Sequence, residues 1–227
     1  MRIFKSNKQA LKKKEEAKFR KTSFSQEGED MILSRIFGES ETGFYVDIGA
    51  HHPQRFSNTM VFYQKGWRGI NIDALPGSMD FFNKERPGDI NLETAISDKE
   101  VELTFHIFND EALSTFSKEL AQQYQQKEEH FVVSEKKITA RKLGTILHEH
   151  LPAGKKIDFM SIDVEGHEMN VLKSNNWDVY KPEVVLVECF DFDLISFPES
   201  ELNRFMEGIG YHFFAKTINT VFFSLIQ

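Results

Sequence analysis

Four acidic residues stand at the ends of short apolar runs that are typical of buried strands. They are Asp47, Asp73, Asp163 and Glu188. In an open parallel α/β sheet, ligands bind beyond the carboxyl ends of the strands, near the point where the strand order reverses. We therefore expect these carboxylates to lie along one edge of a sheet and to line a ligand site.

The first of these runs leads into the loop Tyr45-Val-Asp-Ile-Gly-Ala-His-His-Pro53. Gly49 and the small Ala50 allow a ligand to approach the backbone, but the Gly-x-Gly-x-x-Gly pattern that binds a pyrophosphate is absent. A ligand without phosphates, such as S-adenosylmethionine, therefore fits this loop better than a dinucleotide does. Asp47 could orient its ammonium group and Asp73 could accept both ribose hydroxyls. Strand-end aspartates also cap helices, so that alternative stays open.

A second group of titratable residues lies in Asp163-Val-Glu-Gly-His-Glu168. Methyl transfer to oxygen needs a hydroxyl placed in line with the sulfonium methyl and a base that takes up its proton. Asp163, Glu165, His167 and Glu168 are the candidate bases, and His167 is chemically the most natural because histidine titrates at about pH 6.5. Glu165 and Glu168 could instead satisfy free N–H groups at the start of the next helix.

A metal ion is a further option at this edge of the sheet. Asp163 and Glu188 end adjacent predicted strands, and two hard oxygen ligands favour magnesium or calcium over zinc. Such a cation would lower the pKa of an acceptor hydroxyl and position it. After Glu188, the segment Phe190-Asp-Phe-Asp193 combines aromatic and acidic residues that could grip a sugar. No serine stands in a Gly-x-Ser-x-Gly elbow, which gives no support to a serine hydrolase.

The chain resembles the FkbM methyltransferase family in four motifs: Ser25-Gln-Glu-Gly-Glu-Asp-Met-Ile-Leu, Val46-Asp-Ile-Gly-Ala-His, Gly66-Trp-Arg-Gly-Ile and Ile162-Asp-Val-Glu-Gly-His-Glu-Met-Asn-Val-Leu. The resemblance spans roughly Phe24 to the C-terminus. It implies a class I methyltransferase fold and S-adenosylmethionine as the methyl donor. The acceptor in this family is usually a hydroxyl group of a sugar, a glycolipid or a polyketide.

The resemblance also implies roles for particular residues. Asp47, Gly49 and Ala50 would line the methionine end of the donor, Asp73 would hold the ribose, and the segment from Ala95 to Asp98 would lie beside the adenine. His51-His52-Pro53 departs from the usual Asn-x-Gly ending of this loop, so neither histidine is assigned a role.

We therefore expect an O-methyltransferase that acts on a sugar, glycolipid or polysaccharide-type acceptor. Two alternatives stay open. One is an inactive relative that only binds its ligand. The other is a nicotinamide-dependent oxidoreductase, which the missing glycines oppose.

The elements that must position these residues alternate between strands and helices, which predicts a mostly parallel sheet with helices on both faces and a C-terminal antiparallel hairpin. Strands are predicted at residues 44–49, 69–73, 90–96, 157–163, 184–188, 211–214 and 221–225. Helices are predicted at residues 26–37, 57–66, 76–85, 143–150, 167–173 and 199–209. Ser23 and Gln26 resemble a capping box for the first helix. The region from residue 101 to 139 is expected to be an inserted or edge element.

Composition sets the remaining expectations. The chain has 227 residues, enough for one domain of ordinary size, which we place at residues 23–227 after a basic arm at residues 1–22. The net charge is −7 although nine Lys and Arg precede residue 22, so the body is acidic and no nucleic-acid partner is expected.

The basic arm leaves contact with a membrane surface open. No apolar run approaches the roughly 20 residues that span a bilayer, and a cytoplasmic protein is expected. The single cysteine, Cys189, allows no intrachain disulfide and is expected in the core. The sequence does not predict the oligomeric state.

Overall fold

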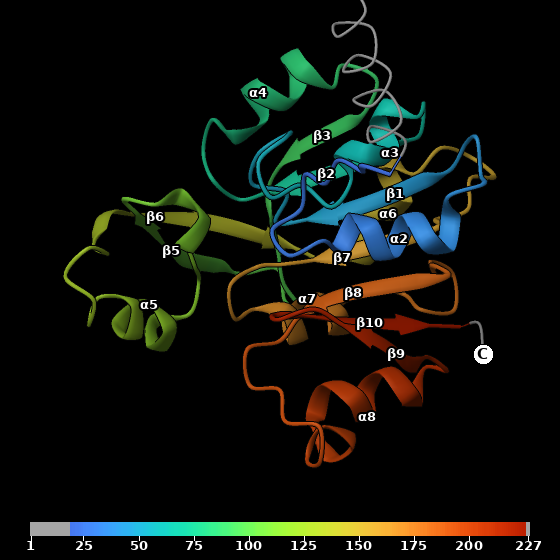
Figure 1. Ribbon diagram of the computed structural model, residues 1–227. Helices are drawn as coiled ribbons and strands as arrows, with labels where there is room; N and C mark the ends of the chain where they lie inside the picture. Colours follow the sequence, from blue (N-terminus) through green and yellow to red (C-terminus); the bar gives the residue numbers. More distant parts are fainter. Residues whose placement is uncertain (1–18, 226–227) are drawn as a thin grey trace, which may run out of the picture.

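The computed structural model describes residues 19–225. Its centre is a seven-stranded sheet of order β3-β2-β1-β7-β8-β10-β9, in which the first five strands are parallel and β10 is antiparallel to both of its neighbours (Figure 1). The strands are β1 (Phe44–Ile48), β2 (Arg68–Asp73), β3 (Ile90–Glu93), β7 (Phe159–Ile162), β8 (Val184–Glu188), β9 (His212–Lys216) and β10 (Thr220–Ser224). This order confirms the expected α/β class with its C-terminal hairpin.

Helices cover both faces of the sheet, and its central strands are therefore buried on both sides. They are α2 (Glu29–Phe37), α3 (Met60–Gln64), α4 (Ser78–Glu85), α6 (Leu143–His150), α7 (Glu168–Ser174), α8 (Glu201–Gly208) and the short 3-10 helix η2 (Phe197–Glu199). Helices α2 and α3 pack on the face that carries Tyr45 and Phe159. Helices α6, α7 and α8 pack on the opposite face around Ile48 and Val185.

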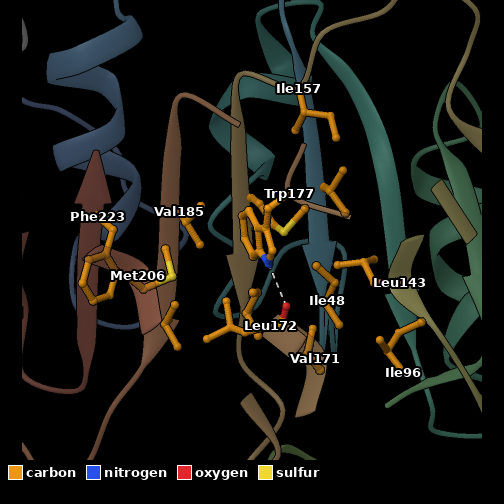
Figure 2. Packing of buried hydrophobic residues seen from close by; sticks show 14 of the residues in the cluster. Ile48, Ile96, Leu143, Ile157, Val171, Leu172, Trp177, Val185, Met206 and Phe223 are labelled. Carbon is orange, nitrogen blue, oxygen red and sulfur yellow. Dashed lines mark hydrogen bonds between the residues drawn. The ribbon is translucent and has the colours of Figure 1, made fainter. Parts of the chain in front are cut away.

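Trp177 lies within the larger of these two cores. Its indole N–H donates a hydrogen bond to the backbone carbonyl of Leu172, with a distance of 2.8 Å (Figure 2). The ring therefore fills the core without leaving its one polar atom unsatisfied.

The middle region forms an insertion with a sheet of its own. Strands β4 (Ala95–Ile96), β5 (Glu102–Phe108) and β6 (Val132–Arg141) pair in the order β4-β6-β5. Between β5 and β6 lie the 3-10 helix η1 (Glu111–Leu113) and helix α5 (Lys118–Tyr124). The insertion extends to one side of the main sheet (Figure 1).

Three details differ from the sequence predictions. Helix α2 begins at Glu29 after Gly28, whose φ is 90°, and Ser23 does not cap it but donates a hydrogen bond to the Asp30 carboxylate. The strand predicted at residues 90–96 is split, because the N–H of Thr94 bonds the Asp73 carbonyl and the chain then crosses into the second sheet. Cys189 is only partly buried at the edge of the core.

Most of the predicted basic arm lies outside the described residues. Within residues 19–225, no helix combines the length and apolar character that crossing a membrane requires.

A buried arginine fixes the loop that follows β1. Arg86, at the end of α4, is fully buried and donates to the Thr59 hydroxyl at 2.7 Å and to the Ser57 hydroxyl at 2.6 Å. It also donates to the carbonyl of Pro53. Thr59 in turn donates to the Asp47 carboxylate at 3.0 Å. One guanidinium therefore ties three points of the loop to α4.

We expect Arg86→Met to lower the free energy of unfolding by about 3 kcal/mol, because it leaves buried acceptors unsatisfied. Urea denaturation measures this loss. Arg35→Met, on an exposed position of α2, serves as the control and should change stability by no more than about 0.5 kcal/mol. Equal losses in the two variants would contradict the role of Arg86.

Candidate active site

A cavity lies at the carboxyl ends of β1, β2 and β7, where the strand order reverses. It encloses about 840 Å³ of empty space, including its open mouth. Six of the residues singled out in the sequence line it: Gly49, Asp73, Ala95, Asp163, Glu165 and His167. Two of the four strand-end carboxylates, Asp73 and Asp163, therefore line the same cavity.

Gly49 brings the loop after β1 into contact with the loop after β7. Its φ is 80°, and a Cβ at this position would lie 1.6 Å from the carbonyl oxygen of Asp163. The N–H of Asp163 donates to the Ile48 carbonyl at 2.9 Å, which closes the contact from the other side. No residue with a side chain fits here, so the glycine serves the backbone contact as well as ligand approach.

Asp73 is partly buried in the cavity wall and fixes the loop after β1. One carboxylate oxygen accepts the N–H of His51 at 2.8 Å and the other accepts the N–H of Leu75 at 2.7 Å. Burial raises its pKa, and these two hydrogen bonds oppose that rise. Each oxygen keeps a second lone pair, which could accept a ligand hydroxyl.

Three residues predicted to contact the donor are not part of the cavity wall. Asp47 accepts a hydrogen bond from the Thr59 hydroxyl instead, and burial raises its pKa to about 6. Ala50 packs in a small core with residues of α4. Asp98 accepts from Asn170 on α7 at 3.1 Å. All three support the surrounding loops.

An acidic cluster lies at the ends of β7 and β8, with Asp163 and Glu165 in the wall of this cavity and Glu188 outside it. Asp163, Glu165 and Glu188 each offer a carboxylate oxygen, and these oxygens lie within 4.8 Å of one another. Burial raises the pKa of all three. The negative charge of Asp163 raises the pKa of Glu165 and Glu188 further, and that of Glu168 raises the pKa of Asp163. One oxygen of Glu188 is buried and has no hydrogen-bond partner among the described residues. The cluster can therefore hold protons or a cation.

Glu168 has the structural role that was left open for it. Its carboxylate accepts the N–H of Val164 at 3.2 Å and that of Gly166 at 2.9 Å, which closes the turn before α7. It does not line the cavity.

The insertion fixes Glu165, a contact that the sequence did not reveal. Its carboxylate accepts the phenolic O–H of Tyr124 at 2.5 Å, and its carbonyl accepts the hydroxyl of Thr115 at 2.6 Å. Glu165 has a φ of 52°, a conformation that is rare outside glycine, and these two contacts help to maintain it. The insertion therefore orients a candidate base.

His167 is partly buried rather than exposed. Its Nε2 lies 3.0 Å from the Ser97 hydroxyl, and burial lowers its pKa. This contact places the imidazole between the cavity and β4.

Other residues line the cavity although the sequence predicted no role for them. His51 lines the cavity with a φ of 52° and a buried Nε2 that has no partner in the described part of the chain. Gln26 and Phe56 line both this cavity and a second one of about 270 Å³, which reaches Glu188. The segment 190–193 lines neither cavity, because the Asp193 carboxylate accepts N–H groups of its own loop.

Comparison with known proteins gives a family match. A family model described as "Methyltransferase FkbM domain" matches residues 47–213. No curated protein matches the chain significantly. Among solved structures, a TehB-like SAM-dependent methyltransferase from Corynebacterium glutamicum ATCC 13032 Kitasato is similar over 99% of each chain, with 9% identity and a TM-score of 0.39. A TM-score at that level adds nothing to the strand order described above.

The histidine in the cavity predicts a pH-dependent stability. Burial lowers the pKa of His51 to about 4 from the usual 6.5, so its contribution to folding is complete above pH 6.5 and is lost as the pH falls toward 4. The loss amounts to about 2 kcal/mol after allowance for partial exposure. His51→Asn keeps the left-handed backbone conformation and removes the titration.

Urea denaturation at pH 7 and pH 4 measures this effect. Relative to the wild-type protein, His51→Asn should lose about 2 kcal/mol less stability between the two pH values. The same loss in both proteins would show that His51 is not buried in its neutral form.

Proposed function

This chain belongs to the FkbM methyltransferase family, and on that premise we propose that it transfers a methyl group from S-adenosylmethionine to a hydroxyl oxygen of a sugar, glycolipid or polysaccharide-type acceptor. The observation that carries the proposal is the shared wall of the cavity. Gly49 and Asp73 on the donor side meet Asp163 within one enclosed space. The family membership opposes the nicotinamide-dependent alternative.

The donor is a cation, and the cavity suits a cation. Asp163 and Glu165 are partly buried carboxylates in its wall, and a positive sulfonium beside them reduces the cost of their charge. Asp73 presents free lone pairs for the ribose hydroxyls. The loop at Gly49 leaves room for the methionine end.

Transfer to oxygen needs one proton acceptor. The acceptor oxygen attacks the methyl carbon as the bond from carbon to sulfur breaks, and the hydroxyl proton passes to the Asp163 carboxylate. Burial raises the pKa of Asp163 toward neutrality, which makes the carboxylate a better base. Glu165, held by Tyr124, is adjacent and can relay the proton to solvent.

We expect Asp163→Asn to lower kcat by roughly 100-fold or more and to leave the affinity for S-adenosylhomocysteine within about threefold. The assay follows transfer of tritiated methyl from S-adenosylmethionine to carbohydrate and glycolipid fractions of cell extract. Mass spectrometry of hydrolysed product then locates an O-methyl sugar. Asp178→Asn, on the exposed surface, is the matched control with unchanged turnover.

Two results would contradict the proposal. Label in protein or nucleic acid would exclude the acceptor class. Tight binding of S-adenosylhomocysteine without methylation of any fraction would favour the inactive relative.

We further propose that Asp163 and Glu188, together with Glu165, hold a divalent cation such as Mg²⁺. The spacing of their oxygens, within 4.8 Å of one another, supports this. Three carboxylates this close, one buried and two partly buried, repel one another unless a proton or a cation lies between them. A bound cation would lower the pKa of the acceptor hydroxyl and position it next to Asp163.

We expect about 5 mM Mg²⁺ to raise the melting temperature of the wild-type protein by several degrees, because a ligand of the folded state stabilises it by mass action. EDTA should reverse the shift. Glu188→Gln should show no shift, whereas Glu207→Gln, an exposed control on α8, should behave as the wild-type protein does. The absence of any shift in the wild-type protein would indicate that the cluster holds protons instead.

A further inference from the structure

The insertion contributes part of the cavity wall. Phe105 on β5 and the segment that follows it line the same space as Asp73 and Ala95. The residues of that segment in the wall are Glu111, Ala112, Ser114 and Phe116. The cavity is therefore partly enclosed by an element that lies outside the seven-stranded sheet.

The segment is fixed over the cavity from two sides. On the β7 side, the Thr115 hydroxyl donates to the Glu165 carbonyl at 2.6 Å. On the β1 side, the Arg55 guanidinium lies 3.6 Å from the Asp110 carboxylate. Behind it, Thr115 and His106 exchange two backbone hydrogen bonds. These contacts give the segment a defined position.

Phe116 forms one side of an apolar slot. The centroid of its ring lies 4.5 Å from that of the Phe105 ring and 5.8 Å from that of the His167 imidazole. Phe105 is almost fully buried. Ala95 and Ile96 of β4 also line the cavity. Because β4 pairs with β6, the hydrogen bonds between these two strands attach the rest of the insertion to this part of the cavity wall. A flat, aromatic ligand group suits such a slot.

Glu111 adds a carboxylate on the Asp73 side of the cavity. Its side chain makes no hydrogen bond or ion pair within the part of the chain that the structure describes. Its negative charge contributes to the raised pKa of Asp73, after the larger effect of burial. Two carboxylates in one wall can accept the two hydroxyls of a ribose.

We propose that the insertion is a donor-binding element, in which Phe116 packs against the purine ring of S-adenosylmethionine and Glu111 shares the ribose hydroxyls with Asp73. This inference rests on the proposed function, because it concerns the same donor. It assigns recognition of the nucleoside half to residues that lie outside the main sheet.

Isothermal titration calorimetry with S-adenosylhomocysteine tests the proposal. Phe116→Ala should raise Kd about five- to tenfold through lost ring packing, and Glu111→Ala should raise it about threefold or more. The matched controls are Phe131→Ala and Glu128→Ala, which change exposed residues of the same insertion that do not line the cavity. Both controls should bind as the wild-type protein does.

A second ligand locates the contact. 5′-Methylthioadenosine keeps the nucleoside and the sulfur but lacks the amino-acid end, so each variant should weaken its binding by the same factor as for S-adenosylhomocysteine. An unchanged affinity for 5′-methylthioadenosine in both variants would place the contacts at the methionine half and overturn the proposal. Phe116→Leu keeps the apolar volume without the ring and should give an intermediate loss, which guards against a folding defect in Phe116→Ala.

Failure of the proposed function and failure of the proposed role of the insertion give different results. If the wild-type protein binds neither ligand, the proposed function is wrong. If it binds both and the Phe116 and Glu111 variants bind them equally well, only the role of the insertion is wrong.

Discussion

The backbone contact between Gly49 and Asp163 is the constraint on which the site depends. A Cβ at Gly49 would lie 1.6 Å from the Asp163 carbonyl oxygen, so the loops after β1 and β7 can meet only through a glycine. The hydrogen bond from the Asp163 N–H to the Ile48 carbonyl holds the same two loops. Because strand order reverses between β1 and β7, this contact joins the donor loop to the acidic cluster in one cavity.

The charge state of the carboxylates in the site depends on the burial and the charged groups around them. Arg86 is buried behind the loop after β1, with its guanidinium used by Ser57, Thr59 and the Pro53 carbonyl. Within residues 19–225, no comparable cation contacts the carboxylates at the ends of β7 and β8, and burial raises the pKa of these groups. Ionising these carboxylates is therefore costly, and a sulfonium or a divalent cation beside them reduces that cost.

The sequence predicted the parts of this structure that depend on local patterns. Apolar runs located the strands of the main sheet, and strand ends located Asp73 and Asp163 in the cavity wall. It did not reveal the hydrogen bond that the Asp47 carboxylate accepts from Thr59, so it assigned to the donor a residue that does not line the cavity.

Contacts between segments that are far apart in the chain could not be predicted from the sequence. Tyr124 and Thr115 reach Glu165 across 41 and 50 residues of chain, and no periodicity in the insertion indicates where it docks. Glu168 had two readings from the sequence, and only the distances to Val164 and Gly166 assign it to the turn. A crystal structure of the full chain with S-adenosylhomocysteine would show directly whether the donor binds in this cavity. We expect the ribose hydroxyls on the Asp73 carboxylate and the sulfur facing Asp163, whereas ligand bound elsewhere, or ribose away from Asp73, would contradict the assignment of the cavity.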